Sequence, residues 1–123
     1  MAQVKIAPIA GEASIRMVRD GRADRDATAT AVRYLLQVLA KEAEGNSVEV
    51  RVPPHGAVQA IEGPNHTRGT PPNVVEMDAE TWIALATGTR EWAEALDSGD
   101  ISASGSRADL SEYLPVVWER IVP

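Results

Sequence analysis

The sequence contains no cysteine, and this absence removes several functional classes at once. Disulfide staples, thiolate metal sites, cysteine nucleophiles and iron–sulfur clusters all require cysteine. Histidine is scarce as well, with only His55 and His66 in the chain. The motifs of phosphate-binding loops, dinucleotide folds, serine hydrolases and zinc peptidases are also missing. We therefore expect a protein that is not an enzyme and that carries no cofactor.

The chain also lacks a long apolar run. No stretch approaches the roughly 20 residues that a membrane helix requires, and no apolar segment near the start precedes a cleavage site. The 12 basic and 18 acidic residues give a net charge of -6, which has the wrong sign for binding nucleic acid. We expect a cytoplasmic protein with no integral membrane segment and no nucleic-acid partner.

The composition is that of a folded globular chain, with 44% hydrophobic and 24% charged residues among 123. Residues 1–26 show no sustained periodicity, so we expect an N-terminal arm of uncertain order. Residues 27–123 are predicted to form a single domain.

An amphipathic helix is predicted over residues 27–44, because apolar side chains recur there at steps of three and four residues. Asp26 or Thr28 is the expected N-terminal cap, and Gly45 is expected to end the helix in a left-handed conformation. Valines then alternate with charged residues over 48–52, which predicts a half-buried strand.

Residues 57–63 and 73–77 are the next two strand candidates. The first of them should pair antiparallel with the valine strand, because only a short turn separates the two. Two short helices are expected after these strands, one capped by Asp78 and one capped by Thr89. Gly88 and Gly99 are expected to close these two helices. The second helix should bury the face that carries Trp92, Ala93 and Leu96.

The C-terminal part adds a weak strand over 101–104 and a helix that begins at a capping box formed by Ser106 and Asp109. Pro115 should break that helix before a last helical turn or two. This order of elements predicts an α+β fold, with a mainly antiparallel sheet of four to five strands covered by helices on one face.

Two stretches resemble the sterol carrier protein family, and most closely its small bacterial branch. They read VEVRVPPHGAVQAIEGPNHTRGTPPNVVEMD and TWIALATGTREWAEALDSGDISASGSRADLSEYLP, and the resemblance covers about residues 28–115. It implies a sheet with helices packed over one face and an apolar cavity between them. The implied activity is non-catalytic binding or transfer of a lipid or another small apolar or amphiphilic ligand. The expected apolar walls of the cavity are Trp82, Leu85, Trp92, Leu96, Ile101 and Leu110.

His66, Arg68 or Arg107 is expected to hold a polar head group at the mouth of that cavity. Each has a purely structural alternative. Arg68 could pair with a carboxylate near its own loop, and Arg107 could bridge to Asp100. The tryptophans could likewise be ordinary core residues rather than cavity walls.

A metal site is not expected, although His55, His66 and Glu62 could in principle supply ligands from neighbouring loops. An alternative function is a protein-interaction module with a filled pocket, which would bind a protein partner or form a homo-oligomer. Such a module would use the strand edge PPNVVEM or the acidic C-terminal helices. An accessory role beside an isomerase or transferase is a third hypothesis.

Overall fold

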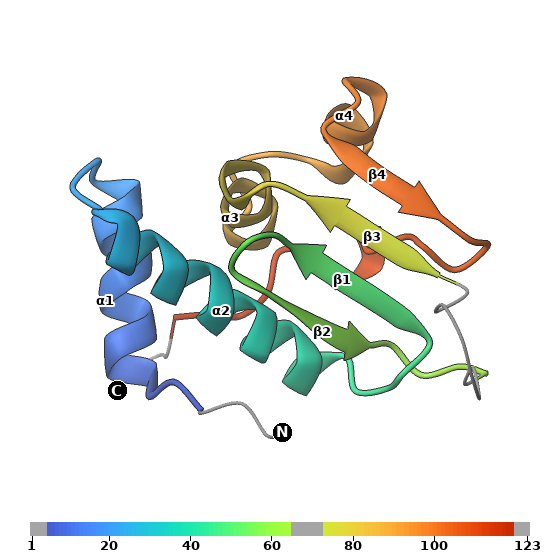
Figure 1. Ribbon diagram of the computed structural model, residues 1–123, viewed down its shortest axis with the longest axis horizontal. Helices are drawn as coiled ribbons and strands as arrows, with labels where there is room; N and C mark the ends of the chain where they lie inside the picture. The colour runs from blue at the N-terminus through green and yellow to red at the C-terminus, as the bar shows by residue number, and fades with distance from the viewer. Residues whose placement is uncertain (1–4, 65–72, 120–123) are drawn as a thin grey trace.

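The computed structural model describes residues 5–64 and 73–119. Figure 1 shows a four-stranded sheet with helices arranged at one side and one end of it. In chain order the elements are α1 (Pro8–Arg19), α2 (Arg25–Glu42), β1 (Val48–Val52), β2 (Gly56–Ala60), β3 (Val74–Met77), α3 (Ala79–Thr87), α4 (Trp92–Asp97), β4 (Ile101–Ser104) and a 3₁₀ turn, η1 (Ser111–Tyr113).

The predicted α+β class is confirmed, but the sheet is mixed rather than mainly antiparallel. Its strand order is β2-β1-β3-β4, with antiparallel pairs β1–β2 and β3–β4 and a parallel pair β1–β3. β3 therefore runs in the direction of β1 and opposite to β2. Because β3 has a partner strand on both sides, the described part of the PPNVVEM segment, residues 73–77, offers no free strand edge, contrary to the alternative drawn from the sequence.

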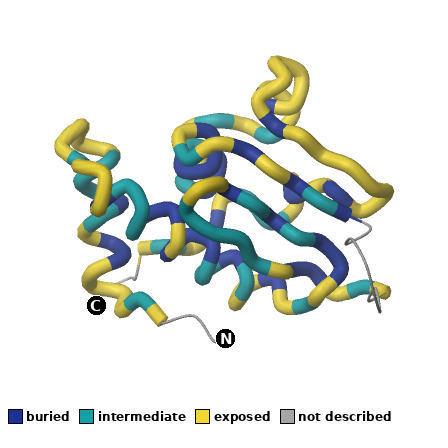
Figure 2. Tube along the Cα trace, in the orientation of Figure 1, coloured by how far each residue is buried: buried dark blue, intermediate teal, exposed yellow. Residues whose placement is uncertain are grey.

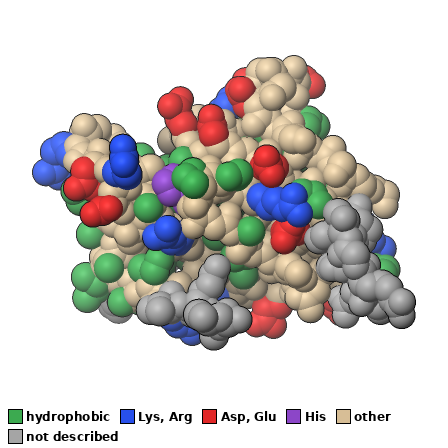
Figure 3. Space-filling model, in the orientation of Figure 1, with side chains coloured by type: hydrophobic (Ala, Val, Ile, Leu, Met, Phe, Trp, Pro, Cys, Tyr) green, Lys and Arg blue, Asp and Glu red, His purple; other side chains and the backbone are tan. Residues whose placement is uncertain are grey.

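The valine strand is confirmed as half-buried. Val48, Val50 and Val52 are buried, whereas Glu49 and Arg51 between them are partly exposed and form an ion pair. The alternation is visible along the strands in Figure 2, and charged side chains gather on the sheet face seen in Figure 3. One face of the sheet therefore contacts the core, and the opposite face meets water.

Trp82 of α3 lies at the centre of the core, where its side chain is fully buried. Its indole Nε1–H donates a hydrogen bond to the backbone carbonyl of Val32 on α2, at 3.2 Å. A buried indole needs such a partner, because an unpaired polar group inside a protein is costly. This bond joins α3 to α2 across the core.

Within the arm expected at residues 1–26, the structure forms helix α1, which the sequence pattern did not predict. Its buried residues are Gly11, Glu12 and Ile15, and the partly buried Val18 also packs against the core. With a glycine and a glutamate on the same face, two apolar side chains make too short a repeat to mark an amphipathic helix.

Two of the helix starts differ from the predictions. Asp24, not Asp26 or Thr28, caps α2 and accepts a hydrogen bond from the Ala27 N–H at 2.8 Å. The second short helix begins at Trp92 without a side-chain cap, so Thr89 does not have the predicted role. Its hydroxyl donates instead to the Ala84 carbonyl of the preceding helix.

Several other ends are confirmed. Asp78 caps α3 through the Thr81 N–H at 2.8 Å. The three glycines expected after helices all have positive φ, with values of 149° at Gly45, 87° at Gly88 and 83° at Gly99. An added Cβ at Gly45 would also lie 2.1 Å from the Ile61 carbonyl oxygen, which leaves no room for a side chain there.

The prediction of a helix at the capping box, followed by a helical turn or two after Pro115, is wrong for the described residues. The chain turns at residues 105–107, and only the single 3₁₀ turn η1 follows. Asp109 receives the N–H of Ser111 rather than closing a box with Ser106. Residues 114–119 then run without helix, and the Val116 N–H donates to the Ala86 carbonyl at the end of α3.

The predicted burial of α4 is also corrected. Trp92 is only half-buried and Leu96 is 40% exposed, while Ala95 is the fully buried residue of this helix. A six-residue helix beside the edge strand β4 covers little surface, so one small side chain is enough to fill its contact.

We predict that the two helical tryptophans differ strongly in their contribution to stability. Trp82→Ala should lower the free energy of unfolding by about 3–5 kcal/mol, because it empties a fully buried site. Trp92→Ala should cost about 1–2 kcal/mol, because part of its ring is already in water. Urea unfolding of both variants tests this, and equal losses would contradict the assigned burial.

Gly11 provides a test of how α1 is held. Ordinarily Gly→Ala inside a helix stabilises a protein, by up to about 1 kcal/mol. Here the added Cβ would lie 2.1 Å from the Tyr34 ring, so Gly11→Ala should instead destabilise by about 1–3 kcal/mol. The control is the reverse exchange, Ala13→Gly, on the exposed face of α1, which should cost about 1 kcal/mol. A higher urea midpoint for Gly11→Ala would show that α1 does not pack closely on α2.

Candidate functional site

A cleft of about 670 Å³ lies between α1, α3 and the C-terminal segment. It falls within the range of about 300–1,000 Å³ that is usual for small-molecule sites. The lining is predominantly apolar at α1 and α3, with one aromatic ring from the C-terminal segment. The residues that line it are Ile15, Val18, Arg19, Thr28, Ala79, Glu80, Ile83, Ala84, Thr87, Thr89 and Trp118.

Helix α3 presents two different apolar faces, and this explains the position of the cleft. Trp82 and Leu85 point into the core, whereas Ile83, Ala84 and Thr87 line the cleft. A short helix that is apolar on most sides needs cover on most sides. The sheet and α2 cover one face of α3, and α1 with the C-terminal segment encloses the other.

Three threonines contribute the uncharged hydroxyl groups of the lining, but their hydroxyl protons already take part in hydrogen bonds. Thr28 donates to the Asp24 carbonyl at 2.9 Å, Thr87 to the Ile83 carbonyl at 2.6 Å and Thr89 to the Ala84 carbonyl at 3.3 Å. Because these donors are satisfied within the protein, an apolar ligand in the cleft would leave none of them unpaired.

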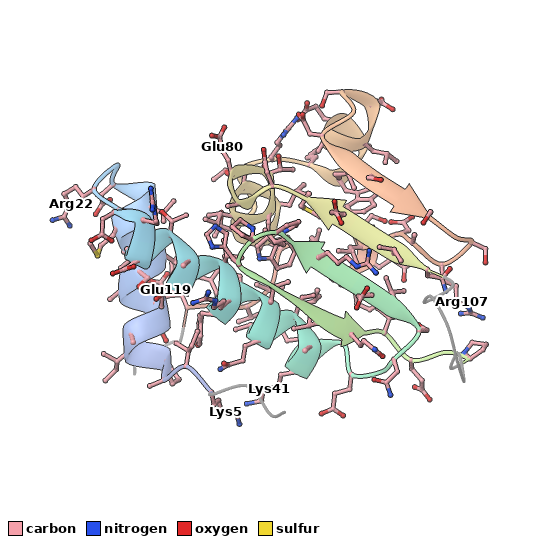
Figure 4. All side chains as sticks on the ribbon, viewed as in Figure 1. Lys5, Arg22, Lys41, Glu80, Arg107 and Glu119 are labelled. Carbon is pink, nitrogen blue, oxygen red and sulfur yellow. The ribbon has the colours of Figure 1, made fainter. Side chains whose placement is uncertain are left out.

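The two charged residues of the lining are Arg19 on α1 and Glu80 in the first turn of α3. The Arg19 side chain is 58% exposed and lies 3.6 Å from the Asp20 carboxylate. Glu80 is exposed and projects from α3 away from the sheet, as Figure 4 shows. The charged groups of the lining therefore lie at the solvent-exposed margin of the cleft rather than deep inside it.

The third wall of the cleft is Trp118, in a segment that is tied down at several points. The Val117 N–H donates to the Glu42 carboxylate, at 3.0 Å and 3.2 Å from its two oxygens. The Arg16 guanidinium lies over the Trp118 ring, 5.8 Å from its centroid. Arg16 also donates to Glu119, and this hydrogen bond raises the pKa of Arg16 above its usual value. The C-terminal segment is thus held against both α1 and α2.

The apolar residues predicted to form cavity walls lie elsewhere. Trp82, Leu85, Ile101 and Leu110 are buried in the core, and none of them lines the cleft described above. The same holds for the half-buried Trp92 and the exposed Leu96. The core thus gathers four of the six predicted wall residues, and their part in ligand binding stays a prediction.

Of the predicted head-group residues, only Arg107 lies in the described part of the chain, because His66 and Arg68 fall outside it. Arg107 is exposed at the end of the sheet opposite α1, as Figure 4 shows, and its backbone N–H donates to the Asn73 side chain. It does not line the cleft, and its part in ligand binding stays a prediction.

The family model described as bacterial SCP ortholog matches residues 24–116. The chain belongs to this family. The resemblance to sterol carrier proteins seen in the sequence is therefore confirmed. A search of curated proteins found no match.

The match does not extend over the whole cleft of this SCP ortholog. Helix α1 precedes the matched residues and Trp118 follows them, whereas Thr28 and all of α3 lie inside. The cleft is thus composite, because its α3 wall belongs to the matched domain and two further walls come from flanking segments.

Sequence reasoning missed most of the cleft, although some signals were present. Ile15 and Val18 are spaced three residues apart, and Ile83 adjoins the predicted core residue Trp82 on a helix that is apolar all round. Trp118 stands out as one of only three tryptophans. What no local pattern shows is that these distant residues meet.

A metal centre finds no support in residues 5–64 and 73–119, which bring together no group of three histidine, aspartate or glutamate side chains able to hold an ion. Over the same ranges, no helix is both long and apolar enough to cross a bilayer.

A second polar cluster surrounds Arg90, at the start of the turn before α4. Its guanidinium donates to Glu94 at 2.6 Å and 3.0 Å, to Ser98 at 2.8 Å and to Asp100 at 2.6 Å. Asp100 is therefore paired with Arg90. The alternative in which Arg107 bridges to Asp100 is wrong. The cluster joins the two ends of α4 to the start of β4, which gives it a structural role.

The Arg90 cluster generates a prediction about pH. The hydrogen bond from Arg90, followed by that from Ser98, holds the pKa of Asp100 below its usual value. A carboxyl whose pKa is lowered by folding stabilises the protein above its unfolded pKa, and this contribution is lost as the pH falls through the folded value. Stability should therefore decline below about pH 4, and Arg90→Gln should lessen that decline.

Carboxyl NMR titration provides the direct measurement. Arg90→Gln should return the pKa of Asp100 towards its ordinary value, whereas Arg107→Gln, a matched change at an exposed arginine, should leave it where it is. An Asp100 titration that responds to Arg107 instead would show that the ion-pair assignment is wrong.

Proposed function

We propose that the cleft between α1, α3 and Trp118 binds a lipid or another small apolar or amphiphilic ligand, and that the protein carries this ligand without transforming it. The observation that supports this most directly is the apolar cleft of about 670 Å³ in a member of the sterol carrier family. Its location differs from the space between helices and sheet that the resemblance implied, since the core occupies that space with Trp82, Leu85 and Leu110.

The residues of the lining support binding rather than catalysis. General acid–base or nucleophilic catalysis requires a positioned base beside the reacting group. The described lining contains no histidine, and its threonine hydroxyls donate to backbone carbonyls of their own helices instead of to a base. Arg19 and Glu80 are the charged groups of the lining, and both face water.

Burial of an alkyl chain supplies the binding energy in this proposal. Each methylene group removed from water contributes about 0.8 kcal/mol, which corresponds to about a fourfold gain in affinity. A cleft with apolar walls from Ile83, Ala84 and Trp118 should therefore bind longer chains more tightly until its length is filled.

The test is a titration with straight-chain primary alcohols of increasing length, followed by calorimetry or by displacement of a fluorescent apolar probe. We expect saturable binding, with affinity rising about fourfold per methylene group before it levels off. Alcohols are used because they carry no charge, so the measurement reports the apolar walls alone.

Ala84→Trp provides the matching variant, because a large side chain on this wall should fill the cleft. It should weaken alcohol binding at least about tenfold. Ala93→Trp, the same change on the exposed part of α4, is the control and should bind as the parent protein does. Absence of saturable binding at every chain length would refute the proposal, and equal binding by both variants would move the site away from this cleft.

A further inference from the structure

Arg16 is the cation placed most closely to the aromatic wall of the cleft. It follows Ile15, which lines the cleft, and its guanidinium lies over the ring of Trp118, another lining residue, at 5.8 Å from the ring centroid. Cationic side chains prefer the face of an indole ring, so this contact holds Arg16 beside the Trp118 wall, although Arg16 is not itself a lining residue.

Two carboxylates contact Arg16, and they differ in environment. Glu12, one turn earlier on α1, lies 3.4 Å away, and its side chain is only 6% exposed. Glu119 lies at 2.7 Å, but its side chain is 51% exposed and that of Arg16 is 39% exposed. Exposed ion pairs are weak and are screened by salt, so the contact with Glu119 is readily exchanged.

Loss of Glu119 would leave Arg16 oriented but short of one partner. Glu12 sits on the same helix as Arg16 and stays beside it whatever the C-terminal segment does. The planar guanidinium has several donors and binds two carboxylates at once, so an acid group from another molecule can take the place of the one that leaves.

From this arrangement we propose that Arg16 is the acid-group site of the cleft, that the ligand is an anionic amphiphile such as a long-chain carboxylate, and that the Glu119 carboxylate occupies this site when no ligand is bound. The proposal rests on the proposed function, since the alkyl chain of the ligand would lie in the cleft. The acid group of the ligand would replace Glu119 on Arg16 at the edge of Trp118.

Arg19 is a weaker candidate for the same role, although it lines the cleft. Its side chain is 58% exposed, and it pairs with the neighbouring Asp20 at 3.6 Å. Unlike Arg16, it has no described contact with Trp118 or with the C-terminal segment. Its own hydration would compete with any acid group that it met.

The experiment compares dodecanoate with dodecanol at pH 8, where the acid is ionised, by calorimetry on the full chain. Arg16→Met should weaken dodecanoate binding about tenfold or more and leave dodecanol binding unchanged. Glu119→Gln should act in the opposite direction and strengthen dodecanoate binding about two- to fivefold, because it removes the competing charge. This gain should shrink at high salt.

Arg22→Met is the matched control, because this exposed arginine lies on the turn between α1 and α2 and does not line the cleft. It should bind both ligands as the parent protein does. Arg16→Met leaves the buried Glu12 without one of its partners, so thermal unfolding of that variant is recorded beside binding. Glu119→Gln changes only an exposed side chain and gives an independent result.

The outcomes separate this inference from the proposed function. If dodecanol binds and dodecanoate affinity is unchanged in both Arg16→Met and Glu119→Gln, Arg16 is not the acid-group site and only this inference is overturned. If dodecanoate weakens equally in Arg22→Met, the effect is one of general charge and the inference also fails. If neither ligand binds the parent protein, both the cleft function and the acid-group site are refuted.

Discussion

The rotation of α3 about its own axis determines where this protein has a core and where it has a cleft. Trp82 sets that rotation, because its ring is fully buried and its indole N–H is bonded to the Val32 carbonyl of α2. With Trp82 directed into the core and bonded to α2, Ala84 two residues on lies on the opposite side of the helix, and Ile83 lies between them, buried but also lining the cleft. A helix turned by half a turn would fill the cleft and open the core.

The second determinant is how closely α1 approaches α2. At Gly11 the two helices pass so near each other that a Cβ atom would enter the Tyr34 ring, and the Gln37 side chain exchanges two hydrogen bonds with the Ile6 backbone. These contacts make α1 a fixed wall. The C-terminal segment is held by the buried side chain of Val116, by one backbone bond to α3 and by polar side chains at its surface. Beyond Val116, the Trp118 wall of the cleft depends on the exposed polar contacts.

The sequence allowed prediction of the parts of the fold that are set locally. Alternating valines predicted β1 as a half-buried strand, and Asp78 with Gly88 bounded α3 to the residue. The mixed sheet was not predictable in this way, because the direction of β3 depends on a connection and not on its own side chains. Helix α1 was not predicted because its buried contact residues are a glycine, a glutamate and one isoleucine. That combination is recognisable as a contact face only when the facing surface of α2 is known.

The candidate site was still harder to predict, for a physical reason that concerns tryptophan. A tryptophan on a short helix has the same appearance in a sequence whether it fills the core, as Trp82 does, or lies half in water, as Trp92 does. The resemblance to sterol carriers implied an apolar cavity between helices and sheet, where the core lies instead, and the matched residues contain only the α3 wall and the start of α2 of the observed cleft. The walls that complete this cleft come from segments outside the match.

That division has a consequence for selectivity within the family. The α3 wall offers methyl groups and hydroxyls whose protons are already bonded, so it distinguishes ligands by size and apolarity and by little else. Among the charged groups at or near the cleft, Glu80 on α3 lies within the matched residues, whereas the two cations, Arg16 and Arg19 on α1, and Glu119 in the C-terminal segment lie outside them. Because a charge at the edge of an apolar site discriminates between acids and neutral molecules, the flanking segments are the natural place for ligand preference to change while the domain keeps its core.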